Sequence, residues 1–133
     1  MGSQFSSMKA KLTYTGIRVK DLDASVDFYT KLLGMKEVGR TKVEVADGEV
    51  VNLVSEDDGH MIELNYYSPG SKFASKYMEG EGLDHLAFQV ENLDKALEEF
   101  SKAGHPTVLD MKSKTSRWAY VQDPNGIYIE LFA

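Results

Sequence analysis

The sequence predicts an α+β fold of two tandem βαβββ modules, whose curved mixed sheets surround a cavity. Three observations lead to this fold class. The sequence repeats itself once, both copies carry the same order of strand and helix signals, and the last strand of each copy alternates apolar and polar residues. Alternation with a period of two indicates a half-buried strand, and a helical period of apolar residues indicates a helix packed on a sheet.

The internal repeat is carried by two blocks. In the first block, the segment from Tyr14 realigns with the segment from His85 at an offset of 71 residues. In the second, residues 54–64 realign with residues 121–131 at an offset of 67. Because both blocks recur in the same order, a duplicated module is predicted. Five residues of the second block recur identically, namely Val54, Gly59, Ile62, Glu63 and Leu64.

The first copy opens with a strand predicted over residues 11–19 and a helix after it. Asp21 is suited to cap that helix, and Gly34 to end it in the left-handed conformation. Two strands near residues 50–55 and 60–66 then meet at the hairpin signal Asp58-Gly59. The apolar face of the helix is predicted from the spacing of Leu22, Val26, Tyr29 and Leu33.

The second copy repeats these signals. Asn92 is the predicted helix cap and Gly104 the predicted helix stop. Strands near residues 118–121 and 127–132 meet at Asn125-Gly126, a second hairpin signal. The apolar face of this helix consists of Leu93, Ala96, Leu97 and Phe100.

A single domain is expected for residues 8–133, made of a module at 8–67, a linker at 68–82 and a module at 83–133. The linker has Pro69 and Gly70 near its start and Gly80 and Gly82 near its end, which is typical of a connecting segment. Residues 1–7 have no cationic start and no apolar stretch, so we interpret them as vector-derived residues rather than a targeting signal.

Composition narrows the classes of partner. The 133 residues include 15 Lys and Arg against 21 Asp and Glu, and a net charge of -6 is unsuited to nucleic acid. No cysteine occurs, so a metal ion must be held by nitrogen and oxygen. No apolar run approaches the ~18 residues that a membrane span needs. We expect a cytoplasmic protein with a small-molecule substrate and no nucleic-acid or membrane partner.

Strand parity places four polar side chains on the sheet face away from the helices. Ile17 and Val19 must pack on the first helix, so Tyr14, Gly16 and Arg18 point to the other face. Any one polar residue on such a face is ordinarily solvated, but glutamate is depleted in strands and recurs here at one repeat position. One imidazole and two carboxylates would suit a hard or borderline metal ion. The four residues are Tyr14, Glu63, His85 and Glu130.

Three stretches of the sequence resemble the vicinal oxygen chelate superfamily of glyoxalases, bleomycin-resistance proteins and extradiol dioxygenases. They are residues 18–29 (RVKDLDASVDFY), 82–88 (GLDHLAF) and 123–131 (DPNGIYIEL). The resemblance covers the chain from Tyr14 to Phe132 and is strongest to the glyoxalase I-like lyases. It implies a glyoxalase-like fold, with metal ligands on the first and last strands of the two modules.

Carried over position by position, the resemblance implies that Glu63, His85 and Glu130 bind one divalent ion per site, which would be Ni, Zn, Mn, Co or Fe. The family's first ligand, a His or Gln, falls on Tyr14. A phenol with a pKa of about 10 binds a divalent ion well only after deprotonation. Three interpretations of Tyr14 stay open: a weak ligand, a hydrogen-bond donor to the substrate, or a sign that the metal is lost.

The implied activity is that of a lyase or isomerase acting on a small alpha-hydroxy or alpha-oxo carbonyl substrate through an enediolate, similar to lactoylglutathione lyase. A cation on two adjacent substrate oxygens would stabilise the enediolate. A carboxylate would move the proton. By resemblance Glu130 is the favoured base, with Glu63 on the other side of the reacting carbon and Tyr14 beside them.

Five residues are expected to contact the substrate. Arg18 matches an arginine that grips the carboxylate of the thiol cofactor in glyoxalase I, although a surface ion pair is an equal alternative. The family's asparagine falls two residues early, at Asn65, so the choice between glutathione and another thiol stays open. Aromatic residues would wall the cavity, with core packing as the alternative for Trp118. The five are Arg18, Asn65, Tyr67, Trp118 and Tyr128, and further linker-side wall residues are Tyr66, Phe73 and Tyr77.

Two other function classes stay open. A metal-free binding or sequestering protein of the bleomycin-resistance type would use the same cavity, and an epimerase would use the same proton chemistry. An extradiol dioxygenase is less favoured, because its iron site would need a second His on the cavity face. His60 and His105 follow turn signals and are predicted to be exposed. A homodimer is expected, because a second chain can complete the open sheet edges.

Overall fold

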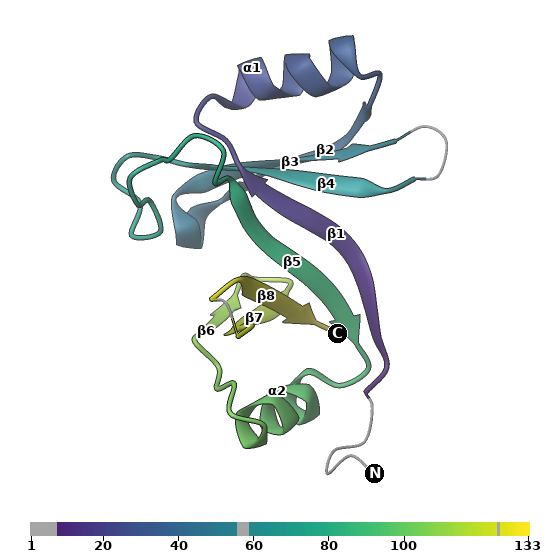
Figure 1. The fold of residues 1–133 in the computed structure, drawn as a ribbon, viewed down its shortest axis with the longest axis vertical. Helices are drawn as coiled ribbons and strands as arrows, with labels where there is room; N and C mark the ends of the chain where they lie inside the picture. Colours follow the sequence, from purple (N-terminus) through teal and green to yellow (C-terminus); the bar gives the residue numbers. More distant parts are fainter. Residues whose placement is uncertain (1–7, 56–58, 125) are drawn as a thin grey trace. The chain divides into compact units, whose positions relative to one another are not determined.

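The computed structural model describes residues 8–55, 59–124 and 126–133, which form two compact units. The first, called the Tyr14 unit, is Tyr14–Asp84. The second, called the His85 unit, is His85–Ala133 together with residues 8–13. The chain passes between the units within two long strands, which Figure 1 draws in purple and green.

The order of elements is βαβββ in both modules, which confirms the α+β class. The first module contains β1 (Ala10–Arg18), α1 (Leu22–Asp27) with a π-helical turn (Phe28–Leu32), β2 (Lys36–Val43), a 3-10 turn (Glu44–Ala46), β3 (Gly48–Val54) and β4 (Met61–Tyr67). The second contains β5 (Leu83–Val90), α2 (Leu93–Lys102), β6 (Leu109–Lys112), β7 (Arg117–Gln122) and β8 (Tyr128–Phe132).

Both units contain a mixed sheet. In the Tyr14 unit the strands lie in the order β2-β3-β4-β1, and in the His85 unit in the order β5-β8-β7-β6. The first and last strands of each module pair in parallel, β1 with β4 and β5 with β8, and the remaining pairs are antiparallel. The strand with the predicted first-strand residue therefore lies beside the strand with the predicted glutamate in each unit, and the two residues are offset by two positions in the register.

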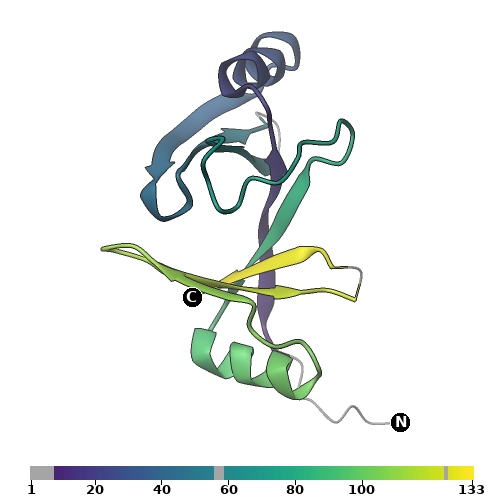
Figure 2. The same cartoon turned by 90° about the vertical axis from the view of Figure 1, so that its left-hand side faces the viewer.

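Each unit has its own hydrophobic core between its helix and one face of its sheet. Helix α1 lies over the sheet of the Tyr14 unit (Figure 1), and α2 lies against the strands of the His85 unit (Figure 2). Burial of these apolar side chains is the main favourable term in folding. The buried residues are Val19, Leu22, Val26, Val51, Leu53 and Leu64 in the Tyr14 unit, and Val90, Leu93, Ala96, Leu97, Ala119, Val121 and Leu131 in the His85 unit.

The predicted helix boundaries are confirmed. The side chains of Asp21 and Asn92 each accept a hydrogen bond of 3.0 Å from the backbone N–H three residues later. Gly34 and Gly104 have φ values of 71° and 93°, which a residue with a Cβ rarely adopts.

The prediction that Leu33 belongs to the apolar face of the first helix is wrong, because its side chain is 60% exposed. The π-helical turn before it adds a residue to the helical turn, so the next apolar position rotates away from the core. Two predicted turn residues, Asp58 and Asn125, lie outside the described residues. Their neighbours Gly59 and Gly126 have φ values of 72° and 84°, as tight hairpin connections require.

None of the helices in the described part of the chain has both the length and the apolar character that crossing a bilayer requires.

Candidate active site

The His85 unit holds two of the predicted ligands close together on the face of the sheet opposite α2. Nε2 of His85 lies 3.8 Å from Oε1 of Glu130, and their side chains are only 2% and 10% exposed. Two donors that bind one divalent ion at about 2 Å lie roughly 3–4 Å from each other, so this spacing fits a pair of ligands. The pair combines one imidazole nitrogen with one carboxylate oxygen, a donor set that suits borderline divalent ions.

Tyr120 extends this pair into a small network. Its hydroxyl donates to Oε1 of Glu130 at 3.1 Å, and its ring meets His85 edge-on with centroids 5.8 Å apart. Tyr120 lies directly opposite Glu130 in the β7–β8 ladder. A phenol therefore holds the buried carboxylate of Glu130 in place, a contact of the kind that orients metal ligands in proteins.

The Tyr14 unit carries the other half of the predicted set. Glu63 is half-buried on β4, where it pairs with Gly16 of β1, and Tyr14 pairs with Met61. The neighbours Ile62 and Leu64 contribute to the core beneath α1, so Glu63 points to the opposite face, as strand parity predicts. Within residues 8–55, 59–124 and 126–133, no three His, Asp or Glu side chains gather closely enough to hold an ion.

The three predicted metal ligands are thus divided between the two units, two in one and one in the other. His85 and Glu130 are brought together in the His85 unit, whereas Glu63 belongs to the Tyr14 unit.

Arg18 holds the linker of residues 68–82 against β1. Its guanidinium donates to the carbonyl of Ser75 at 2.7 Å and to the Ser75 hydroxyl at 3.1 Å. The same group lies over the rings of Tyr67 and Tyr77, at 5.9 and 5.5 Å from their centroids. In the described residues it therefore contacts hydroxyl, carbonyl and aromatic groups rather than the acidic partner of a surface ion pair.

A second contact links the end of β4 to the start of β5. The hydroxyl of Tyr67 donates to Oδ2 of Asp84 at 2.9 Å. Burial and the neighbouring Asp84 carboxylate raise the pKa of Tyr67 far above its ordinary value. The phenol therefore stays protonated and keeps donating to the residue that precedes His85 in the sequence.

The other expected substrate contacts occupy different environments. Asn65 is 4% exposed, and its amide nitrogen donates to the backbone carbonyls of Glu63 at 3.0 Å and Ile17 at 3.4 Å, which gives its N–H groups a structural role. Trp118 is half-buried on β7, opposite Met111 of β6.

The aromatic residues divide between the two faces of the sheets. Tyr128 is 41% exposed and meets Tyr120 edge-on, with centroids 5.9 Å apart. Phe73 lies beside Tyr67, at 6.4 Å between centroids. The prediction that Tyr66 lines the cavity is wrong, because Tyr66 packs against the core on the α1 side of the sheet.

The two remaining histidines lie in different surroundings from His85. His60 is exposed, as predicted. The prediction of exposure is wrong for His105, which is half-buried with Nδ1 2.9 Å from the carbonyl oxygen of Gln122. Its ring thereby ties the segment after α2 to the end of β7.

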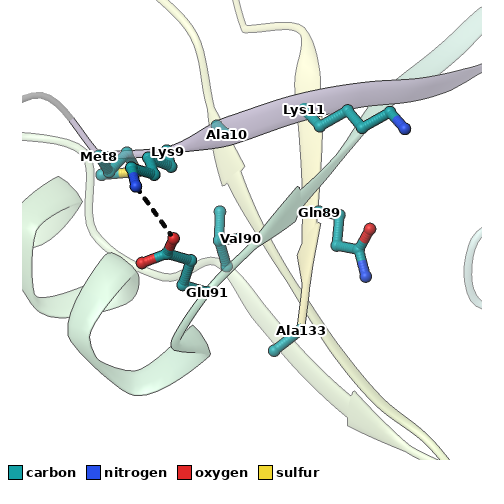
Figure 3. A pocket seen from close by; sticks show the side chains of 8 residues that line it. All are labelled: Met8, Lys9, Ala10, Lys11, Gln89, Val90, Glu91 and Ala133. Carbon is teal, nitrogen blue, oxygen red and sulfur yellow. Dashed lines mark ion pairs between the residues drawn. The ribbon is translucent and has the colours of Figure 1, made fainter.

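A separate open pocket in the His85 unit holds none of the predicted site residues. It has a volume of about 740 Å³ and is lined by residues 8–11 and 89–91 with Ala133 (Figure 3). Nζ of Lys9 and Oε1 of Glu91 form an exposed ion pair of 3.9 Å across it. Such a pair contributes little free energy, and the lining offers no imidazole, so the candidate site remains the His85–Glu130 pair.

Sequence reasoning missed two residues, Tyr120 and Asn52. Each lies opposite one of the predicted glutamates, Tyr120 opposite Glu130 on β7 and Asn52 opposite Glu63 on β3. Cross-strand neighbours share a face and interact directly. Counting back across each hairpin from its glutamate is the signal that would have found them.

Comparison with known proteins gives a consistent result. A profile of the Glyoxalase/Bleomycin resistance protein/Dioxygenase superfamily matches residues 11–131. A lactoylglutathione lyase of Escherichia coli O157:H7 is 35% identical over 129 residues, covering 91% of this chain and 90% of the relative. A probable lactoylglutathione lyase of Synechocystis is 34% identical, covering 90% and 92%. Among solved structures, methylmalonyl-CoA epimerase from Mycobacterium tuberculosis is similar with a TM-score of 0.77 and 26% identity, covering 91% of this chain and 85% of that one.

Proposed function

The chain belongs to the Glyoxalase/Bleomycin resistance protein/Dioxygenase superfamily, and from this premise we propose that it is a divalent-metal-dependent lyase of the glyoxalase I type. Its substrate would be a small alpha-oxo or alpha-hydroxy carbonyl compound joined to a thiol. The observation that carries the proposal is the buried His85–Glu130 pair. The internal repeat supports it, because it places a second glutamate, Glu63, at the position that matches Glu130.

The ligands proposed for the ion are Glu63, His85 and Glu130. Their nitrogen and oxygen donors suit Ni, Zn, Mn, Co or Fe, one ion per site. The ion would polarise two adjacent oxygens of the substrate and so acidify the hydrogen on the carbon next to the carbonyl group.

Glu130 is the proposed base. The reaction moves one proton between two neighbouring carbons of the substrate, so a single carboxylate can take the proton from one carbon and return it to the other. Burial of Glu130 excludes water, which would otherwise compete for that proton. Tyr120 holds Oε1 of this carboxylate in place.

The substrate itself would be positioned by side chains on the same sheet faces. Tyr14 is proposed to donate a hydrogen bond to it, and Arg18 to bind an anionic group of the thiol part. Side chains that would contact the rest of the molecule are Asn65, Tyr67, Trp118 and Tyr128.

Two observations rank the alternatives. The relatives are named as lyases and epimerases, which favours an enzyme over a sequestering protein of the bleomycin-resistance type. His60 is exposed just before β4 and His105 contacts the Gln122 carbonyl, and these surroundings disfavour an iron site with two histidines as in extradiol dioxygenases. An epimerase is the second candidate, because it needs the same proton transfer at a carbon next to a carbonyl.

The proposal is tested by mixing the metal-loaded protein with methylglyoxal and glutathione and following the formation of the thioester by absorbance. Replacement of the base in Glu130→Gln is expected to lower turnover by about 10²–10⁴-fold. Glu98→Gln is the matched control, because Glu98 is an exposed partner of Lys102 on α2.

Thioester formation at equal rates in wild type and Glu130→Gln would refute the assigned base. If no thiol supports thioester formation, while the protein exchanges the alpha hydrogen of methylmalonyl-CoA for deuterium, the epimerase replaces the lyase as the function.

A further inference from the structure

A row of four residues crosses the sheet of the Tyr14 unit on the face opposite α1. Gly39 of β2 pairs with Asn52 of β3, Asn52 pairs with Glu63 of β4, and Glu63 pairs with Gly16 of β1. Directly paired residues point to the same face of a sheet. These four residues are called the Glu63 row. Because its two ends are glycines, only the central residues Asn52 and Glu63 carry side chains.

Asn52 contributes a buried acceptor that the described residues do not use. Its Oδ1 atom has almost no contact with solvent and no hydrogen-bond partner in the described part of the protein. The amide nitrogen is the end of the side chain nearer Gly39, 3.6 Å from the position that a Cβ on Gly39 would take. An unpaired buried acceptor is costly, so a turn of the Asn52 amide that brings Oδ1 to a donor on a ligand would be favourable.

The matching row of the His85 unit is built differently. It consists of Leu109, Tyr120, Glu130 and Ala87. Both of its ends carry side chains, and the residue beside the glutamate is a donor that is already used, because the Tyr120 hydroxyl bonds Oε1 of Glu130. In the Glu63 row the ends are glycines and the residue beside the glutamate offers an unused acceptor. The two copies of the module have therefore diverged, and the Glu63 row is the one suited to receive a donor.

We propose that Oδ1 of Asn52 accepts a hydrogen bond from the hydroxyl group of the substrate, which makes the Glu63 row a binding site for the hydroxyl-bearing carbon. The inference rests on the proposed function, since a 2-hydroxyacyl thioester carries such a hydroxyl on the carbon next to its carbonyl. An amide oxygen accepts from a hydroxyl but gains nothing from a hydrogen atom on carbon. Asn52 therefore selects the hydroxylated thioester over its deoxy analogue.

The test compares two ligands that differ only in that hydroxyl, S-lactoylglutathione and S-propionylglutathione, by calorimetry on metal-loaded and on chelator-treated protein. In Asn52→Leu, which has similar volume but no acceptor, affinity for the lactoyl compound is expected to fall about tenfold. Affinity for the propionyl compound is expected to change by less than about twofold, because it makes no hydrogen bond to Asn52. Gly39→Ala is the control for shape, since its methyl group would make ordinary contact with Nδ2 of Asn52 and is expected to affect both ligands alike.

Unfolding temperatures supply an independent readout without ligand. If Oδ1 is unpaired in the free protein, Asn52→Leu raises the unfolding temperature, whereas an Asn that serves the fold would lower it on replacement. A lowered unfolding temperature, or equal losses of affinity for the two thioesters, overturns the role of Asn52. If wild type binds neither thioester, the glutathione thioester is not the substrate, and the unfolding temperatures still decide whether Oδ1 is an unsatisfied acceptor.

Discussion

The hydroxyl of Tyr120 donates a 3.1 Å hydrogen bond to Oε1 of Glu130, the residue directly opposite it in the β7–β8 ladder. The bond restrains a buried carboxylate that also lies 3.8 Å from Nε2 of His85. Restraint of this kind narrows the orientations that Glu130 can adopt and so favours the one that faces His85. Tyr120 is accordingly the positioning residue of the candidate site.

Replacing Tyr120 by Phe is therefore expected to weaken metal binding by about 10–100-fold, as loss of an outer-shell partner commonly does. The ring and its edge contact with His85 remain, so only the hydrogen bond is removed. Metal affinity is measured by competition with a chromogenic chelator. Tyr29→Phe is the control, because it removes a phenol hydroxyl from a ring that packs against the core of the Tyr14 unit. Equal affinities in the two variants would show that the Tyr120 hydroxyl does not position Glu130.

His85 supplies the second prediction. Chelator-stripped wild type is expected to take up about one ion per site, and His85→Ala to lose that uptake, because a buried imidazole is replaced by a methyl group. Elemental analysis after gel filtration measures the stoichiometry. His60→Ala is the control, since His60 is exposed and outside the pair. Full reloading of His85→Ala would remove His85 from the ligand set.

The Arg18 contacts lead to a prediction about the linker. Arg18→Gln removes the donors to Ser75, so the segment of residues 68–82 should open more often. Hydrogen exchange at the Ala74 amide, which donates to the Ser71 carbonyl, is expected to become about tenfold faster. Lys20→Gln breaks an exposed ion pair with Glu79 and is expected to change the exchange rate of the Ala74 amide by much less. Identical protection in both variants would contradict a role for Arg18 in holding the linker.

Local signals in the sequence predicted the ends of elements well. The caps Asp21 and Asn92 and the stops Gly34 and Gly104 act through bonds to residues only a few positions away, so the sequence contains all the information that they need. Strands β2 and β6 were not located. Strand β2 is an edge strand in which six of the eight residues are exposed, so it lacks the alternation that marks a buried face.

The sequence predicted only those site residues that the internal repeat makes visible. Glu63 and Glu130 stand out because they recur, and His85 because it matches Tyr14 in the repeat and strand parity points it away from the helix. The positions of Asn52 and Tyr120 opposite the two glutamates depend on the register of each hairpin. If the turn of a hairpin were one residue longer or shorter, a different residue would lie opposite its glutamate. The residues at these places are also chemically unlike, so comparison of the two copies did not reveal them.

The fourth prediction concerns assembly. We expect a homodimer, because strands β2 and β6 end the sheets of the two units with unpaired backbone groups, and closed two-fold association is the commonest way to cover such a surface. Light scattering during gel filtration should report about twice the 14.9 kDa mass of the chain. A particle of 14.9 kDa at micromolar concentration would refute the dimer.

Tyr14 supplies the last prediction, because the family resemblance sets it at a metal-ligand position, where a phenol binds a divalent ion well only after deprotonation. It is half-buried on β1, on the same face as Glu63. If its hydroxyl orients the substrate, Tyr14→Phe should leave metal affinity nearly intact and lower turnover about 10–100-fold. If it merely fills a vacated ligand position, Tyr14→His should tighten metal binding, since imidazole binds in its neutral form near pH 7. We favour the first outcome, because a vacated position would more simply hold a small apolar side chain than a half-buried phenol. Metal affinity and turnover measured on wild type, Tyr14→Phe and Tyr14→His separate the two outcomes, and a Tyr14→Phe variant equal to wild type in both would show that the hydroxyl has no role.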